Sequence, residues 1–242
     1  MMRRSTPLIL AVVLPLTAGC IPYSAGTTAV PTPVGTMEPS MSAYFIPAGV
    51  DYEDADSSDS PLFGVDLEAR IGIDDRSDLG IRVPGFVGVV VDYKRRLDAG
   101  PHDGAAVAAT FGGGVVNLGD HALVQAGLLA SGRQNSAATA YGGVKAMQVI
   151  PLTSGAVSDQ PTIGAFAGVR LGSQRLGISP EIGVFYDPSA LDLRQSNWIV
   201  VPSFTFHGQQ LLDLFFGGSR RGADPFPPRP APVPRPPGGR WP

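Results

Sequence analysis

Two carboxylates that could work as an acid–base pair stand two residues apart in the stretch Phe63–Ile73, FGVDLEARIGI. Asp66 and Glu68 share a face of any β-strand, because side chains two residues apart point to the same side. Such a pair could divide proton donation and proton acceptance between its members. Arg70 and Arg82 offer a competing interpretation, in which the carboxylates are held in ion pairs and do no chemistry. We favour the ion pairs and expect no catalytic residue in this stretch.

No other pattern indicates a catalytic or metal site. The three histidines, His102, His121 and His207, lack the spacing of metal ligands and have no neighbouring cysteine. The acidic run at residues 51–60, DYEDADSSDS, offers oxygen ligands for Ca²⁺ but lacks the glycine and the final glutamate of an EF-hand loop. A solvated loop is therefore favoured there. Nucleophile-elbow, P-loop and zincin motifs are absent from the sequence, so we predict a protein that is not an enzyme and has no metal and no cofactor.

The beginning of the chain has the composition of a secretory signal peptide. Arg3 and Arg4 precede an apolar run over residues 7–18, which is shorter than the roughly 20 residues that cross a bilayer as a helix. Cys20, the single cysteine of the sequence, follows in the motif LTAGC. A lone cysteine in an exported protein has no internal disulfide partner, so its presence needs another explanation.

The motif LTAGC resembles the lipobox of bacterial lipoproteins, although Leu16 stands one position further from the cysteine than in the commonest form. The resemblance implies that residues 1–19 are a lipoprotein signal peptide and that Cys20 is acylated and becomes the mature N-terminus. Ile21 is not the aspartate that retains lipoproteins at the inner membrane in the enterobacterial rule, which favours the outer membrane of a Gram-negative bacterium. The alternative is an ordinary secretory signal with an incidental cysteine.

Alternating residues dominate residues 41–208, the predicted barrel domain. In Phe63–Ile73 every second residue is apolar and the residues between are glycine or charged, a period of two that predicts an amphipathic strand. Similar runs, separated by turn motifs, predict about ten strands at residues 42–51, 62–74, 78–85, 86–97, 105–116, 121–131, 139–151, 161–172, 176–188 and 197–208.

Tight turns between consecutive strands predict the connectivity. Strands joined in this way form an antiparallel meander, and a long meander usually closes because closure removes its edges. The predicted fold class is all-β, an antiparallel up-and-down β-barrel of about 8–10 strands. The run DLGIRVPGFV could be one bent strand or two strands.

Two segments flank the predicted barrel. Residues 20–40 are rich in proline, threonine, serine and glycine and are expected to be a flexible, disordered tether. Residues 209–242 are expected to be a short apolar segment and a disordered tail, with nine prolines from Pro225 onward and five arginines against one aspartate from Arg220 onward. The tail could bind an anionic polymer or an aromatic groove of an envelope partner, or have no partner. Nucleic acid is not an expected partner, because the chain between the signal and the tail is acidic.

Charged residues recur on one face of the expected strands, and apolar residues occupy the other face. We expect the charges to form a network in the lumen, consisting of Asp66, Glu68, Arg70, Arg82, Asp92, Lys94, Lys145, Arg170 and Glu181. The apolar runs have the length of about nine to eleven residues that a tilted strand needs to cross a bilayer. The same alternation also fits an inverted barrel, which turns its apolar faces inward and its charges to water.

The stretches ARIGIDDRSDLGIRVPGFVGVVVDYKRRL and GISPEIGVFYDP resemble the strand–turn–strand units of small outer-membrane β-barrels of Gram-negative bacteria. The resemblance implies a barrel inserted in the outer membrane. We therefore expect a non-catalytic, lipid-anchored outer-membrane protein with a structural or binding role, which contacts outer-membrane lipid through the acylated Cys20. The alternative is a periplasm-facing lipoprotein with a soluble, lipocalin-like barrel that binds or carries a small apolar ligand.

Overall fold

The computed structural model describes residues 21–50, 60–101, 104–134, 137–152, 160–172, 176–187, 198–209 and 211. These residues include ten β-strands and one short 3₁₀ turn, Asn117–Gly119. The strands are β1 (Met37–Val50), β2 (Ser60–Asp74), β3 (Ser77–Pro84), β4 (Val89–Arg96), β5 (Ala106–Val116), β6 (His121–Ser131), β7 (Ala138–Pro151), β8 (Thr162–Gly172), β9 (Gly177–Tyr186) and β10 (Trp198–His207). Among the described residues, no helix is long and apolar enough to cross a membrane.

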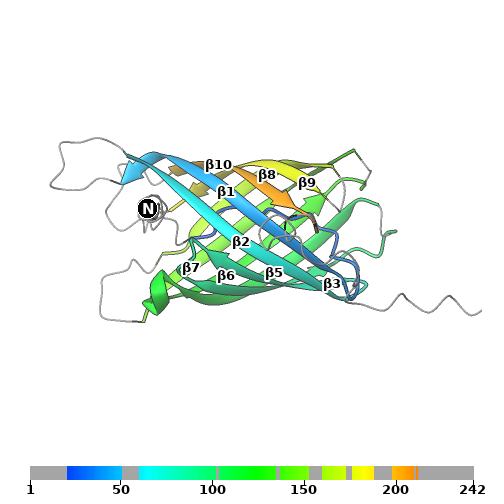
Figure 1. Ribbon diagram of the computed structural model, residues 1–242, viewed down its shortest axis with the longest axis horizontal. Coiled ribbons are helices and arrows are strands. Elements are labelled where there is room, and N and C mark those ends of the chain that lie inside the picture. Colours follow the sequence, from blue (N-terminus) through cyan, green and yellow to red (C-terminus); the bar gives the residue numbers. More distant parts are fainter. Residues whose placement is uncertain are drawn as a thin grey trace, which may run out of the picture.

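The ten strands close into one antiparallel barrel (Figure 1). Each strand pairs with its neighbours in the sequence, and β1 pairs with β10 to complete the ring. The chain therefore passes back and forth between two ends of the barrel. We call the end that β1 reaches at Val50 the loop end. The opposite end is the turn end, where residues 75–76 join β2 to β3.

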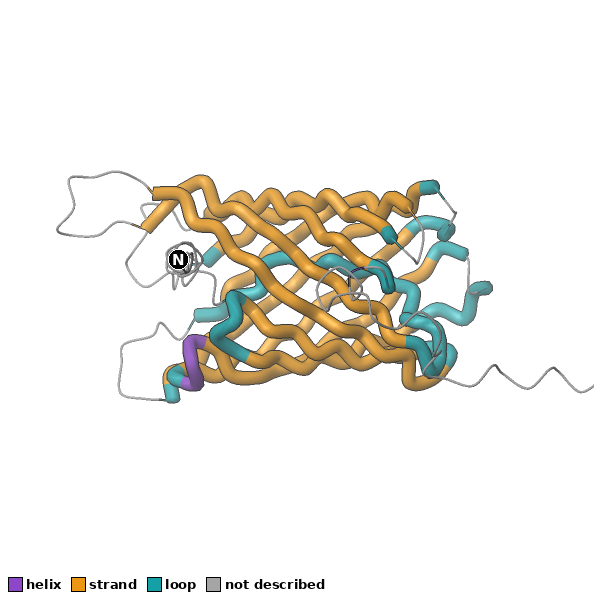
Figure 2. The backbone as a smooth tube through the Cα atoms, in the orientation of Figure 1, coloured by secondary structure: helices purple, strands orange, loops and turns teal. Residues whose placement is uncertain are grey.

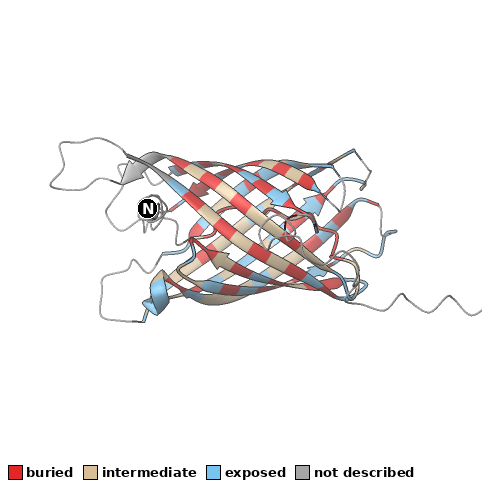
Figure 3. Ribbon diagram, viewed as in Figure 1, coloured by how far each residue is buried: buried red, intermediate tan, exposed pale blue. Residues whose placement is uncertain are grey.

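Alternating residue types account for the two faces of the barrel wall. Along β3 and β4, burial changes from residue to residue: Arg82 and Asp92 are buried, whereas Ile81 and Val91 are exposed. The same alternation covers the barrel wall in Figure 3 as bands of buried and exposed residues. One face of each strand is turned to the lumen and the other is turned outward.

The predicted fold class is confirmed, and the number of strands is the upper value of the expected range. All ten predicted strands are present, with boundaries that differ by a few residues. The run DLGIRVPGFV is not one bent strand, because β3 ends at Pro84 and residues 85–88 form the turn that leads into β4. Pro84 has no N–H to continue the ladder, and Gly85 and Phe86 have φ angles of 54° and 61°, which belong to a turn.

The N-terminal segment is not placed as the sequence suggested. Residues 21–36 pass through the lumen without regular secondary structure apart from one bridge (teal between the strands in Figure 2), and most of them are buried. Residues 37–40 already belong to β1. This placement corrects the prediction of a flexible tether over residues 20–40 for the described residues 21–40. Small residues and prolines suit any segment without helix or strand, whether water or a barrel surrounds it.

Several predicted features lie outside the described residues. They are the signal peptide at residues 1–19, the lipidation site Cys20, nearly all of the acidic run at residues 51–60, His102, and residues 209–242 apart from residues 209 and 211. These interpretations stay predictions.

Candidate functional site

The outer face of the barrel is apolar from strand to strand. Among the charged residues of the described strands, the exposed ones are Asp74 and Arg95, which stand near the turn end of β2 and β4. Each strand from β2 to β10 exposes large apolar side chains, which we call the apolar belt: Phe63, Ile71, Ile73, Ile81, Val89, Val91, Val107, Phe111, Val115, Val124, Leu128, Val144, Ile150, Ile163, Val169, Leu171, Ile182, Val184, Tyr186, Trp198, Val200, Phe204 and Phe206. The belt is far more extensive than the scattered apolar residues on the surface of a soluble monomer.

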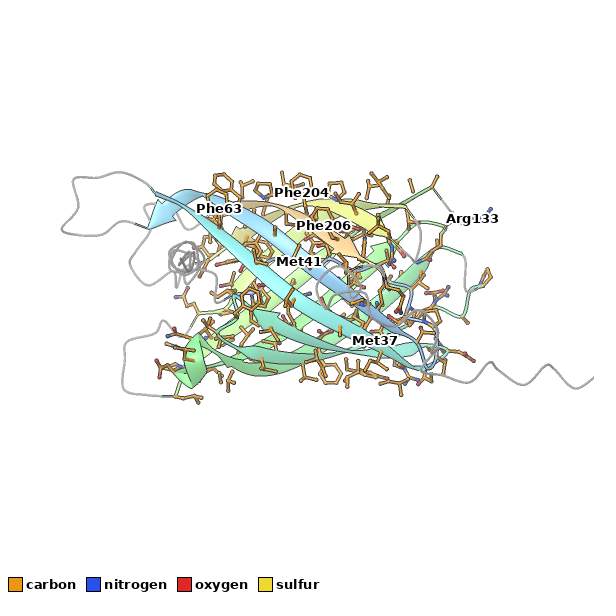
Figure 4. All side chains as sticks on the ribbon, in the orientation of Figure 1. Met37, Met41, Phe63, Arg133, Phe204 and Phe206 are labelled. Carbon is orange, nitrogen blue, oxygen red and sulfur yellow. The ribbon has the colours of Figure 1, made fainter. Side chains whose placement is uncertain are left out.

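Two pairs of aromatic side chains on the outer face lie at the loop end. The ring centroids of Phe45 and Phe63 lie 4.8 Å apart, and those of Tyr186 and Trp198 lie 5.2 Å apart. The first pair stands on β1 and β2 and the second on β9 and β10, so the two pairs flank the seam between β1 and β10. Figure 4 labels Phe63 near this end. Rings in such a position are typical of the border between hydrocarbon and water.

The structure places the nine residues of the expected charge network on the inner face. Of these, Asp66, Glu68, Arg70, Arg82, Asp92, Lys94 and Glu181 are buried, and Lys145 and Arg170 are partly buried. They do not form one network. We use the name lumenal charge cluster for the group on β2, β3 and β4, which comprises Asp66, Glu68, Arg70, Asp78, Arg82, Asp92 and Lys94.

Arg70 stands at the centre of the lumenal charge cluster. Its Nη1 lies 2.6 Å from Glu68 Oε1, and its Nη2 lies 2.7 Å from Asp78 Oδ1 and 2.8 Å from Asp92 Oδ1. Three carboxylates from three strands thus surround one guanidinium, whose planar set of N–H donors suits several acceptors at once. Buried charges need such pairing, because an isolated charge in a medium of low polarity is very costly.

Arg82 joins the lumenal charge cluster to the N-terminal segment. Its Nη2 lies 2.6 Å from Glu68 Oε2 and also donates to the carbonyl oxygen of Ala25, at 3.1 Å. Its Nη1 donates to the carbonyl oxygen of Ser24, at 2.7 Å. One side chain therefore satisfies a carboxylate of the wall and two peptide groups of the segment.

Asp78 and Lys94 bind the following part of the segment. Lys94 Nζ lies 3.0 Å from Asp78 Oδ2 and donates to the carbonyl oxygens of Thr28 (3.0 Å) and Val30 (3.2 Å). The same Asp78 oxygen accepts a hydrogen bond from the N–H of Thr32, at 2.8 Å. A buried chain without secondary structure must find partners for its peptide groups, and the charged residues of the wall provide them.

Glu181 and Lys145 lie apart from the lumenal charge cluster and also bind the N-terminal segment. The carboxylate of Glu181 accepts hydrogen bonds from the N–H groups of Ala25 (2.9 Å) and Gly26 (3.2 Å) and from the hydroxyl of Tyr141 (2.9 Å). Lys145 Nζ donates to the carbonyl oxygen of Pro22, at 2.6 Å. Their role in the structure is to hold a peptide, and neither takes part in an ion pair of the cluster.

Arg170 has a different partner from the other eight residues. Its Nη2 donates to Glu38 of β1, and the same Glu38 oxygen lies 3.8 Å from Nδ1 of His207. His207 Nε2 lies 2.9 Å from the hydroxyl of Ser179. No group of three or more possible metal ligands occurs among the residues that the structure describes.

Apolar contacts hold the N-terminal segment together with the hydrogen bonds. The ring of Tyr23 packs edge-on against Phe185, at 5.1 Å between centroids, and against Tyr44, at 6.4 Å. Nearer the turn end, Ala29 and Val30 belong to a second buried cluster, together with Ala25, Ala106, Ala108, Leu129, Tyr141 and Phe166. The lumen is thus packed with a peptide, as the interior of a soluble domain is packed with side chains.

Two glycines are required where the segment approaches the wall most closely. Gly26 has a φ of 60°, and a Cβ on it would lie 2.8 Å from Thr205 Oγ1. A Cβ on Gly72 would lie 2.2 Å from the carbonyl oxygen of Pro33. Gly72 also accepts a backbone hydrogen bond from Gly35, at 3.0 Å. A larger residue at position 72 would therefore push the segment off the wall.

Asp78 and the lumenal position of the segment were not predicted from the sequence. Asp78 could have been found, because it stands four residues before Arg82 and an even spacing places both on one strand face. The segment had a weaker signal, since residues 21–37 contain no charged side chain although they were expected to lie in water. Its partners are wall residues far away in the sequence, which no local pattern reveals.

No protein-family model matches this chain, and no curated protein matches it. Among solved structures, the outer membrane protein Ail of Yersinia pestis is 11% identical over 71% of this chain and 99% of its own, with a TM-score of 0.32. OprG of Pseudomonas aeruginosa is 11% identical over 75% and 99%, with a TM-score of 0.33. A de novo designed transmembrane β-barrel is 12% identical over 73% and 98%, also with a TM-score of 0.33. Similarity at this level carries no statement about activity.

Proposed function

We propose that this chain is an outer-membrane β-barrel protein that is also anchored by an acylated Cys20, and that its role is structural or binding and not catalytic. The observation that carries the proposal is the apolar belt on the outer face of the barrel. On the described strands, the exposed charged residues are Asp74 and Arg95, and both stand near the turn end. Apolar surface costs about 25 cal/mol per Å² in water, whereas hydrocarbon accepts it. A closed barrel also leaves no unpaired strand edge in lipid.

The inverted, lipocalin-like barrel has no support in this arrangement. It requires apolar side chains inside and room for a ligand, which for a drug-sized molecule means a cavity of about 300–1,000 Å³. A hollow of about 460 Å³ at the turn end is lined by charged residues, Asp75, Arg76, Arg96 and Asp98, and does not suit an apolar ligand. Between the N-terminal segment and the wall there is a cavity of about 30 Å³, with Thr110, Gln125 and Lys145 in its lining. Oε1 of Gln125 has no hydrogen-bond partner. The space and the polar lining suit an ordered water molecule and not an apolar ligand.

A filled lumen also argues against an open diffusion pore. The contacts of this protein with other molecules are therefore assigned to its lipid-facing belt, to the two ends of the barrel and to the tail. The tail has five arginines against one aspartate from Arg220 onward. Its arginines and prolines suit an anionic polymer or an aromatic groove of a partner in the cell envelope.

The lipid anchor is supported by the motif LTAGC and is tested separately. Cells that express the full chain are grown with a labelled fatty acid. We expect the label on the wild-type chain and its complete loss in Cys20→Ala. Label that remains on the variant would exclude Cys20 as the acylated residue, without bearing on whether the barrel spans the membrane.

The membrane-spanning barrel is tested by the contact of Leu67 with lipid. Leu67 lies between Met41 of β1 and Val83 of β3 on the outer face. The mature chain with Cys20→Ala is refolded in lipid vesicles and carries a nitroxide label on Leu67→Cys or, as the matched control, on Glu68→Cys. We expect the label at 67 to collide with dissolved oxygen, which concentrates in lipid, and the label at 68 to collide with little of it. A label at 67 that collides instead with a water-soluble nickel complex would overturn the proposal.

A further inference from the structure

The C-terminal end of the described chain leaves the barrel at the turn end. β10 runs from Trp198 at the loop end to His207 at the turn end. The N–H of Gly208 then donates to the carbonyl oxygen of Pro39, near the start of β1, at 3.0 Å. The residues of the tail therefore begin on the side of the turn end.

The N-terminal segment connects the turn end to the loop end through the lumen. Val34 forms a parallel bridge with Gly72, two residues before the end of β2 at the turn end. At the other side of the lumen, the hydroxyl of Tyr23 donates to Asp187, at 3.2 Å, and Asp187 directly follows the last residue of β9. Ile21 packs against the same group of residues near the loop end. The two ends of the described chain therefore lie at opposite ends of the barrel.

We infer that the mature chain passes through its own barrel, so that residue 20 and the tail lie on opposite sides of the membrane. The inference rests on the proposed function, in which the barrel spans the outer membrane and Cys20 carries the acyl chains. Consecutive Cα atoms are about 3.8 Å apart, so residue 20 is next to Ile21 at the loop end. The acyl chains then enter the leaflet on the side of the loop end, and the tail belongs to the side of the other leaflet.

The lengths of the connections indicate which side faces out of the cell. Outer-membrane barrels have short turns in the periplasm and longer loops outside. The two longest connections between strands, residues 152–161 and 187–197, are at the loop end, and the shortest, residues 75–76, is at the turn end. The acyl chains accordingly belong to the outer leaflet. The arginine- and proline-rich tail belongs to the periplasm, where its partner would be an anionic polymer.

The seam between β1 and β10 offers a route by which the acylated Cys20 can reach the loop end although the N-terminal segment fills the lumen. Ser40–Tyr44 of β1 pair with Ser203–His207 of β10, which is five residue pairs, whereas β9 and β10 pair over ten. If this seam closes last, the wall encloses the segment from the side. The acyl chains then never pass through the lumen.

The inference is tested with two epitope-tagged full-length chains, examined with antibody on intact and on permeabilised cells. One carries the epitope between Cys20 and Ile21, and the other carries it after Pro242. We expect the N-terminal epitope to give the same signal on intact and permeabilised cells. The tail epitope should give a signal only after permeabilisation. Two epitopes that appear on the same side would overturn the inference.

Two single thiols distinguish a failure of the inference from a failure of the proposed function. Leu118 is 83% exposed at the loop end, between β5 and β6, and Arg133 is exposed at the turn end, between β6 and β7 (Figure 4). We expect a membrane-impermeant maleimide to label Leu118→Cys on intact cells and Arg133→Cys only after permeabilisation. The chain without an introduced cysteine is the control for background labelling, because the sulfur of an acylated Cys20 is not free to react.

Each pattern of labelling has one meaning. If the two thiols behave alike, the barrel does not span the membrane, and the proposed function fails together with the inference. If the thiols differ but both epitopes appear on one side, the barrel spans the membrane and the passage through the lumen is refuted. If Arg133→Cys and the tail epitope are the ones accessible on intact cells, the assignment of the acyl chains to the outer leaflet is refuted.

Discussion

The outer wall and the lumen of this barrel are built from alternate residues of the same strands, yet their side chains meet different surroundings. On β2, Val65 and Leu67 face outward, while Asp66, Glu68 and Arg70 face inward and are buried. The outward residues have no polar group to satisfy. The inward residues bind one another and the peptide groups of residues 21–36. A strand of period two can therefore present an apolar surface on one face and bind a peptide of its own chain on the other.

The largest effect is expected from removing that ligand. Deletion of residues 22–34 should leave an intact barrel with a water-filled pore. Water and ions would fill a lumen lined by the lumenal charge cluster, Lys145 and Glu181. In planar lipid bilayers we expect no conductance steps from the wild-type chain and clear steps from the variant. A synthetic peptide with the sequence of residues 21–36 should block them. A variant that folds as a barrel by circular dichroism but gives no conductance steps would show that the segment is not what blocks the lumen.

The next effect concerns the inner face alone. Arg82→Met leaves Glu68 with one cationic partner and removes the donors of two carbonyl groups of the segment. Breaking a buried ion pair from one side costs about 3–5 kcal/mol. Val83→Met, one residue further on the outer face of β3, is the matched control and should cost less than about 1.5 kcal/mol. Urea unfolding in lipid vesicles measures both, and equal losses would remove the distinction between the two faces.

A charge on the outer face tests the other side of the comparison. Leu67→Arg should cost about 2–4 kcal/mol if Leu67 lies near the middle of the hydrocarbon, and Ile73→Arg, at the turn end of β2, about 0–1 kcal/mol. The difference arises because an arginine near the interface reaches water. The same unfolding measurement applies. A cost at position 73 as large as that at position 67 would contradict an apolar belt bounded at the turn end.

The smallest effect is expected from the tail. Deletion of residues 222–242 should leave the temperature of unfolding unchanged within error, because a proline-rich segment without apolar periodicity adds nothing to a packed core. Thermal unfolding followed by circular dichroism compares the shortened chain with the full one. A decrease of several degrees would show that the tail packs against the barrel.

Residue types alone predict the strands and the way they are joined. The period of two in stretches such as Phe63–Ile73 reports the pleat of a single strand, and short turns such as residues 75–76 allow only antiparallel neighbours. Both are local properties, so a closed antiparallel barrel of about 8–10 strands could be predicted from residue types alone. The same periodicity also predicted that Asp66, Glu68, Arg70, Arg82, Asp92 and Lys94 lie on one face.

Which face is inside and what fills the lumen depend on contacts between distant parts of the chain. Alternation is the same in a barrel and in its inverted form. The sequence therefore allowed either Leu67 or Glu68 to face the lumen. The segment at residues 21–36 has no period, and its peptide groups are bound by Arg82, Lys94 and Glu181, which stand 57–58, 64–66 and 155–156 residues away from the atoms they bind. Contacts over such separations exist only after the strands have closed into a ring, and for this reason the same residues that suggested a tether became the core of the barrel.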